Sequence, residues 1–123
     1  MPIINAKRKG NTYERKVCKI LSLYFPGKFE RCSMGIKGAD VICSDDGFPY
    51  ATEAKHQKGI KAIHLLVGNS QIDKWWQQAK EQAGRVNKKP LLVARVERHD
   101  FCTIDGNKWH LFDIWCSMNG NRK

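Results

Sequence analysis

Three residues of the sequence, Asp40, Glu53 and Lys55, have the types and the spacing for divalent-metal chemistry. Glu53 and Lys55 lie in a run typical of a β-strand, where residues i and i+2 share one face. If the strand that carries Asp40 pairs with this one, two carboxylates and an ammonium come together. Such a group can bind a hard divalent cation and hold a water molecule near it. Metal-dependent hydrolysis of a phosphodiester requires both.

A simpler interpretation is a solvent-facing strand with a cross-strand charge pair, because an acid followed by Glu-x-Lys occurs by chance in basic proteins. Three observations favour the functional interpretation. Asp40 opens a hydrophobic strand, where a carboxylate would sit at the rim of the sheet. Glu53 and Lys55 are charged residues inside a mostly apolar strand. Glu14 borders the apolar stripe of a helix and can lean towards the sheet.

The composition indicates a polyanionic partner. The formal net charge is +10, with 22 Lys and Arg against 12 Asp and Glu, and nucleic acid is the commonest partner of so basic a small protein. The five cysteines contain no CxxC pair, which fits a reducing cytoplasm, of a host cell if the source is viral. No apolar run reaches membrane-spanning length, so we expect no membrane partner.

Two amphipathic helices are expected. The first follows a basic flexible arm, residues 1–10, and begins at Asn11, whose side chain is suited to cap it. Apolar residues recur at helical spacing from there to Pro26, where the helix ends. The second helix has Ser70 as its cap and closes at Gly84. Its stripe includes two adjacent tryptophans, at least one of which we expect in the core or a dimer interface.

The remaining β-prone runs predict a sheet. Strands are expected at 29–32, 39–43, 50–56, 90–96, 100–104 and 108–115. The apolar run 63–67 is compatible with a further short strand, and residues 117–123 form a frayed tail. The order of helix, strands, helix and strands predicts a single α/β domain over residues 1–123, with a central mixed β-sheet flanked by α-helices.

The pattern resembles the PD-(D/E)XK nuclease superfamily and, within it, the archaeal-type Holliday junction resolvases with related phage members. The resemblance covers most of residues 8–96, although Ala39 stands where the family has its nominal Pro. It rests on Arg8-Lys9-Gly10 before the helix with Glu14-Arg15, on Arg31 before the Ser/Gly loop, on Gly38-Ala39-Asp40, and on Glu53-Ala54-Lys55. The resemblance implies a restriction-endonuclease-like core and a homodimer with two active sites. It also implies that Glu14, Asp40, Glu53 and Lys55 are catalytic.

Chemistry then suggests a role for each residue of the predicted site. Asp40 and Glu53 would ligate Mg²⁺, for which Mn²⁺ would substitute, and the Ala54 carbonyl would be a third protein ligand. Glu14 would orient a ligand or hold a second ion. Lys55 would orient the attacking water or stabilise charge on the phosphate.

Basic and polar residues around these positions are candidates for contacts with DNA phosphates, although any single one has the simpler interpretation of a solvated charge. They are Arg8, Lys9, Arg15, Arg31, Ser33, Lys37 and Lys58. Ser33 is included because it matches a loop serine of some resolvases.

Three functions remain open at this point. The first is a Mg²⁺-dependent endonuclease selective for branched DNA, in particular the four-way (Holliday) junction. The second is another nuclease of the same superfamily, of nicking, repair or restriction type, since one fold serves many substrates. The third is a basic nucleic-acid-binding module without catalysis. The carboxylates argue against the third, because without a metal they would repel phosphate.

Overall fold

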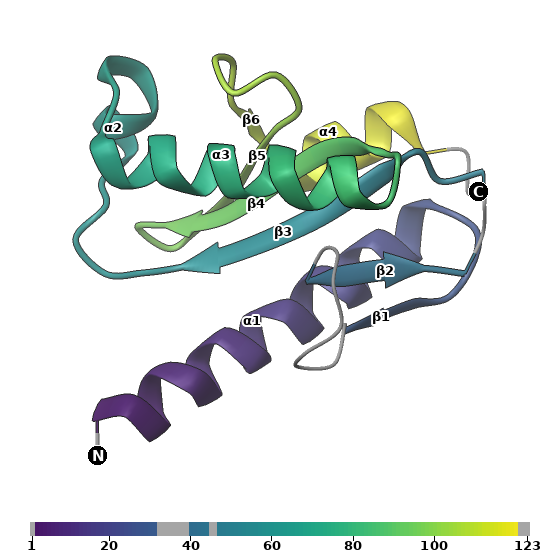
Figure 1. Ribbon diagram of the computed structural model, residues 1–123, viewed down its shortest axis with the longest axis horizontal. Helices are drawn as coiled ribbons and strands as arrows, with labels where there is room; N and C mark the ends of the chain where they lie inside the picture. Colours follow the sequence, from purple (N-terminus) through teal and green to yellow (C-terminus); the bar gives the residue numbers. More distant parts are fainter. Residues whose placement is uncertain (1, 32–39, 45–46, 121–123) are drawn as a thin grey trace.

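The structure is a computed structural model that describes residues 2–31, 40–44 and 47–120, with the backbone alone over residues 2–11. Its elements, in chain order, are α1 (Pro2–Tyr24), β1 (Phe29–Arg31), β2 (Val41–Cys43), β3 (Tyr50–His56), α2 (Ala62–Val67), α3 (Ser70–Arg85), β4 (Lys89–Val96), β5 (His99–Thr103), β6 (His110–Leu111) and α4 (Phe112–Asn119) (Figure 1). No helix in these ranges has the length and apolar character needed to cross a membrane.

The strands form one six-stranded sheet in which spatial order follows chain order, β1 to β6. Neighbours pair antiparallel except β3 and β4, which run parallel from Tyr50↔Lys89 to His56↔Arg95. A parallel pair requires a crossover connection, and α2 and α3 supply it. The expected α/β architecture with a mixed sheet flanked by helices is therefore confirmed.

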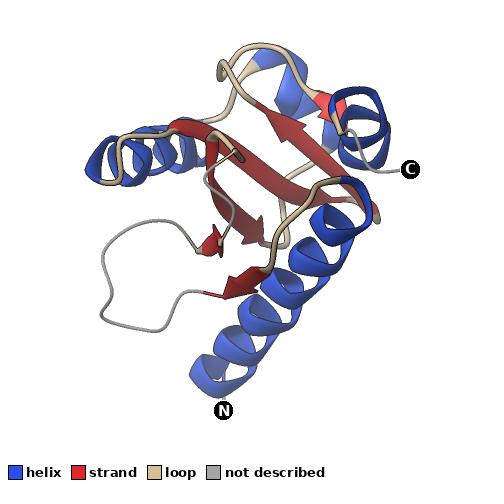
Figure 2. Cartoon of the chain, turned by 90° about the vertical axis from the view of Figure 1, so that its right-hand side faces the viewer, coloured by secondary structure: helices blue, strands red, loops and turns tan. Residues whose placement is uncertain are grey.

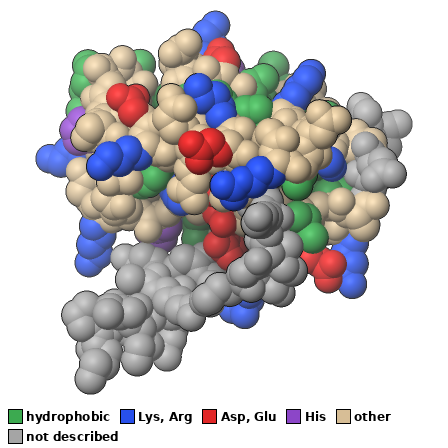
Figure 3. Space-filling view, viewed as in Figure 1, with side chains coloured by type: hydrophobic (Ala, Val, Ile, Leu, Met, Phe, Trp, Pro, Cys, Tyr) green, Lys and Arg blue, Asp and Glu red, His purple; other side chains and the backbone are tan. Residues whose placement is uncertain are grey.

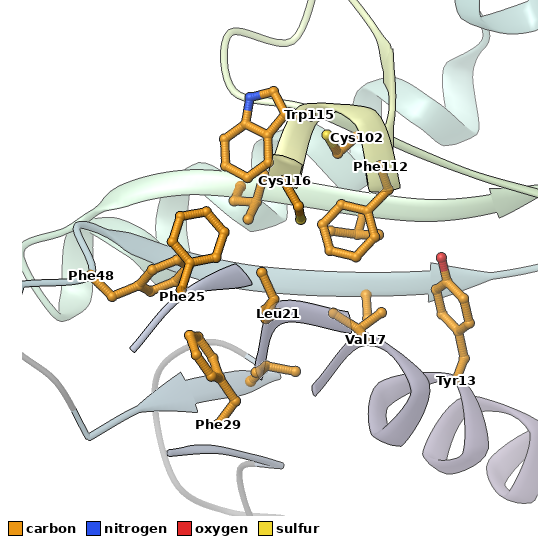
Figure 4. Packing of buried hydrophobic residues seen from close by; sticks show 14 residues of the cluster. Tyr13, Val17, Leu21, Phe25, Phe29, Phe48, Cys102, Phe112, Trp115 and Cys116 are labelled. Carbon is orange, nitrogen blue, oxygen red and sulfur yellow. The ribbon is translucent and has the colours of Figure 1, made fainter. Parts of the chain in front are cut away.

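Helices cover both faces of the sheet, with α3 on one side and α1 and α4 on the other (Figure 2). The central strand β4 is buried on both faces, which is why its sequence is a continuous apolar run. Leu91 and Val93 pack into the cluster under α1 and α4, whereas Leu92 and Ala94 pack into the cluster under α3. Figure 4 shows α1 side chains meeting Phe112 of α4 in the first cluster.

The first helix differs from its prediction. It begins at Pro2, so residues 2–10 are helical where a flexible arm was expected, and Asn11 does not cap the helix. The physical reason is that proline is tolerated in the first turn and that Lys and Arg are good helix formers. The cap of α3 is likewise one residue earlier than predicted, because the Asn69 side chain accepts from the N–H groups of Gln71 and Ile72.

Two further segments differ from a strand: the run 63–67, for which a strand was one possibility, and the run 108–115, for which the strand prediction was wrong over its second half. The run 63–67 lies in helix α2, since a short apolar run does not by itself distinguish strand from helix. The run 108–115 divides into the two-residue β6 and the start of α4. Its buried residues Phe112, Trp115 and Cys116 are spaced i, i+3 and i+4, the period of a helix. Because α4 ends at Asn119, the expected frayed tail is helical over 117–119.

Candidate active site

Strand β3 presents Glu53 and Lys55 on the face of the sheet covered by α3. Lys55 Nζ lies 3.8 Å from Glu53 Oε2 and donates a 2.7 Å hydrogen bond to Oε1 of Gln78 on α3. Ala54, between them, packs into the opposite cluster under α1. The shared face predicted for Glu53 and Lys55 is therefore present, and a helix closes over it.

Asp40 reaches this point from the start of β2. The pairing Val41↔Thr52 is antiparallel, so Asp40 lies beside the part of β3 that continues past Thr52. The backbone N–H of Ala54 donates a 3.1 Å hydrogen bond to Asp40 Oδ2. Because the N–H and C=O of one strand residue point to the same side, the Ala54 carbonyl also faces the Asp40 edge.

Glu14 approaches from α1, as its position beside the apolar stripe predicted. Its Oε1 accepts a 3.0 Å hydrogen bond from Nε of Arg31 on β1. Burial raises the pKa of Glu14, the negative charge of Asp40 raises it further, and Arg31 and Lys55 act in the opposite direction. Glu14 is therefore within electrostatic reach of both Asp40 and Lys55 and lies at the margin of the site that Asp40, Glu53 and Lys55 form.

The carboxylate of Glu53 is the most unusual group of this site. It is 1 % exposed, and neither of its oxygens has a hydrogen-bond partner in the part of the chain that the structure describes. Burial raises its pKa to about 8, with a further contribution from the negative charge of Asp40 and an opposing one from Lys55. A buried carboxylate whose ion-pair contact is as long as the 3.8 Å to Lys55 is costly in its charged form, and a cation between Glu53 and Asp40 would reduce that cost.

The donor set suits a cation that keeps its own waters. Over the described ranges, no group of three or more His, Cys, Asp or Glu side chains is arranged to hold a metal ion. Asp40, Glu53 and the Ala54 carbonyl would therefore be the protein's share of the ligands. Mg²⁺ is bound in this way, through one or two carboxylates with waters and substrate phosphates.

The structure describes only some of the residues that were predicted to contact DNA phosphates. Arg15 is exposed on α1, and Lys58 is exposed in the turn after β3. The side chains of Arg8 and Lys9, which lie on α1, and all of Ser33 and Lys37 fall outside the described residues. In the view of Figure 3, Lys and Arg side chains are spread over the face that α3 covers, with acidic side chains between them. Basic charge on this face is distributed and does not form one patch.

The structure adds Gln78, which the sequence analysis did not select. Its side chain lies next to the apolar stripe of α3, whose members Trp75 and Ala79 are buried. The same argument that drew attention to Glu14, a polar residue bordering a buried stripe, applies to Gln78. Trp75 is core, as expected for at least one of the two tryptophans, and Trp76 is partly buried.

A family model described as "Phage putative PDDEXK endonuclease" matches residues 5–116, a range that contains Glu14, Asp40, Glu53 and Lys55. The chain belongs to this family. The chain is also similar to protein D14 of Escherichia phage T5, with 29% identity over 107 residues that cover 77% of this chain and 67% of that protein. No solved structure matches the chain. Membership of the phage PDDEXK endonuclease family confirms the resemblance to the PD-(D/E)XK superfamily and identifies the chain as a nuclease.

Proposed function

We propose that the chain is a Mg²⁺-dependent DNA endonuclease that acts on branched duplexes, the four-way junction above all. The observation that supports the metal dependence is the buried carboxylate of Glu53, which meets no hydrogen-bond donor among the described residues and lies beside Asp40 and Lys55. Asp40, Glu53 and the Ala54 carbonyl would hold the ion, and Mn²⁺ would substitute for Mg²⁺. When bound, the ion neutralises phosphate charge and lowers the pKa of a water.

Side chains of the protein would orient the groups that take part in cleavage. Lys55 is held between Glu53 and Gln78, so its ammonium is fixed where it can orient a water or stabilise charge on the phosphate. The N–H of Ala54 keeps the Asp40 carboxylate turned towards the site. Arg31 holds Glu14 at its margin, where the carboxylate can orient a ligand or a second ion.

The preference for branched DNA rests on the resemblance to junction resolvases and on symmetry. A four-way junction has two-fold symmetry, and paired cuts require two active sites related by a matching axis. We therefore propose a homodimer. Exposed apolar side chains on α2 and α4, among them Leu66 and Met118, offer surface that a second copy would bury. The basic net charge supports a DNA partner, and the proposed compartment is the cytoplasm of the host cell.

The test is incubation of labelled four-way junction, flap and linear duplex with the protein, with and without Mg²⁺, alongside mass measurement by light scattering. We expect paired, symmetric nicks in the junction only with the metal, and a dimer mass. Equal cleavage of linear duplex, or a monomer mass retained with DNA, would favour a restriction-like or nicking nuclease. Binding without cleavage of any substrate in Mg²⁺ or Mn²⁺ would favour the non-catalytic module.

A further inference from the structure

A second basic site lies beyond the candidate active site, at the ends of the parallel strands. The loop that follows β3 and the turn between β4 and β5 enclose a pocket of about 360 Å³. Four basic side chains line it, Lys58, Lys61, Arg95 and Arg98. None of the carboxylates that the structure describes lies within ion-pair distance of Lys58, Lys61 or Arg98. Glu97 also lines the pocket, so four basic side chains stand against one carboxylate and the lining carries a net positive charge.

The acidic groups near the pocket are already engaged. Glu97 Oε1 accepts a 2.7 Å hydrogen bond from the N–H of Ala62, which fixes the turn between β4 and β5 against the start of α2. Asp100 accepts hydrogen bonds from Tyr13 at 2.9 Å and Arg95 at 3.3 Å, and lies 3.0 Å from Lys16 Nζ. Both walls of the pocket are thereby held in place before any ligand arrives.

The turn that carries Arg98 is strained. It joins Val96 to His99 through two residues, and both have positive φ, 51° at Glu97 and 80° at Arg98. Two-residue turns with positive φ at both positions strongly favour Asn-Gly or other glycine-containing pairs. A non-glycine residue in such a conformation is destabilising, and such strain is found most often at binding and active sites. Local stability alone does not explain an arginine here.

We propose that this pocket binds a backbone phosphate of the DNA duplex that is being cut, a few nucleotides from the scissile phosphate, with Arg98 as its main ligand. The inference rests on the proposed endonuclease function and deepens it. His56, which lines the pocket, follows Lys55 directly on β3. At about 3.3 Å per strand residue, the backbone of His56 lies roughly 10 Å along β3 from that of Glu53, a distance of a few nucleotides along a DNA strand. The His56 side chain points to the opposite face of the sheet, where it contacts Tyr13.

A contact of this kind positions the duplex without reading its sequence. It should therefore contribute to binding in the absence of metal and to KM, and leave kcat at saturating DNA nearly unchanged. Arg98→Ala should weaken binding in EDTA by about 5- to 20-fold and reduce the slope of log affinity against log salt by about 0.9.

The sharpest test pairs protein variants with DNA in which single phosphates are replaced by neutral methylphosphonates, one position at a time around the cut. For the intact protein, one or two replacements should weaken binding by the same factor as Arg98→Ala. In Arg98→Ala those replacements should have no further effect, because the contact is already lost. Additive losses at every position would overturn the inference.

Two variants control for folding and for charge. Arg98→Gly suits the positive φ, so it should be at least as stable to heat as the intact protein and yet bind as weakly as Arg98→Ala. Arg85→Ala removes the same charge from the exposed end of α3, near the start of β4 and far from the pocket. DNA binding by Arg85→Ala should be weakened by the same methylphosphonate replacements, and by the same factor, as binding by the intact protein.

Other outcomes separate the two proposals. If Arg98→Gly binds DNA as tightly as the intact protein, the proposed phosphate site is wrong and the proposed endonuclease function is unaffected. If inorganic phosphate stabilises the intact protein to heat, fails to stabilise Arg98→Gly, and no methylphosphonate couples to Arg98, the pocket takes free phosphate and the inference is wrong. Failure of the intact protein to cleave or bind any DNA would overturn the proposed function itself.

Discussion

Lys55 on β3 and Gln78 on α3 are joined by a 2.7 Å hydrogen bond from the lysine ammonium to the amide oxygen. The bond leaves the ammonium oriented between Gln78 and the Glu53 carboxylate, 3.8 Å away. A lysine side chain has several rotatable bonds, so an acceptor at its end restricts where the charge can lie. We therefore expect Gln78 to act as a positioning residue for Lys55.

Replacement of Gln78 by Ala should lower kcat about 10-fold with little change in KM, because the lysine loses its orientation and the DNA contacts do not change. Steady-state kinetics on the preferred DNA substrate would measure this. Gln77→Ala is the matched control, since Gln77 is the exposed neighbour on the same helix. Equal losses in both variants, or a change confined to KM, would contradict the positioning role.

The two carboxylates at the centre of the site should be indispensable for cleavage. Asp40→Asn, Glu53→Gln and Lys55→Ala should each reduce Mg²⁺-dependent cleavage by about 10³-fold or more, because metal binding and charge stabilisation are lost. DNA binding in EDTA should survive. It should tighten in Asp40→Asn as repulsion of phosphate falls, and in Glu53→Gln only above about pH 8, where the metal-free Glu53 is charged. Single-turnover cleavage and EDTA titrations would measure both effects. The exposed Asp113 on α4, changed to Asn, is the control. Full activity in Asp40→Asn would disprove the assignment.

The stability of the metal-free protein should fall as pH rises. The folded state keeps a proton on Glu53 up to a pH of about 8, whereas the unfolded carboxyl titrates near its ordinary pKa of 4.5. Between these values the folded state binds more protons, so the free energy of unfolding decreases with rising pH, by an amount on the order of a few kcal/mol. The raised pKa of Glu14 adds a contribution of the same sign.

Thermal unfolding in EDTA between pH 5 and 9 would measure this trend. Glu53→Gln should flatten it and be the more stable protein at the alkaline end, because the amide carries no charge to bury. Mg²⁺ should stabilise the intact protein more at pH 8 than at pH 6, since binding competes with the proton. A Mg²⁺ effect of the same size in Glu53→Gln would mean that the ion binds elsewhere.

The ion pair between Arg31 and Glu14 should be visible in the pH dependence of activity. Arg31 lowers the pKa of Glu14 against the effects of burial and Asp40, so Arg31→Ala should raise that pKa. The acidic limb of the kcat/KM profile should then move to higher pH, and Arg31→Lys should restore part of the shift. The control is Lys28→Ala, which removes the exposed ion pair between Lys28 and Glu30, a residue on the same strand as Arg31. An unchanged profile in Arg31→Ala would show that Glu14 does not titrate in the reaction.

The sequence by itself was enough to predict the α/β architecture and the face that Glu53 and Lys55 share. The i, i+2 geometry of a strand requires Glu53 and Lys55 to share a face, and the helical stripe of α1 leaves Glu14 at its border. The continuous apolar run of β4 likewise indicates a strand covered on both faces. These are local consequences of backbone geometry, which a sequence carries directly.

Tertiary structure decided what depends on neighbours remote in the chain. The short apolar runs at α2 and α4 suit either a strand or a helix when taken by themselves. In the helices that form, Leu65 of α2 is buried in one cluster, and Phe112, Trp115 and Cys116 of α4 are buried in the other. The hydrogen bond between Lys55 and Gln78 joins two residues 23 positions apart in the chain, and nothing local specifies it. The basic pocket requires the ends of β3 and β4 to lie side by side, so Arg98 joins Lys58 only once the parallel pair has formed. Such contacts follow from the pairing of strands and from burial, which no local pattern of residues encodes.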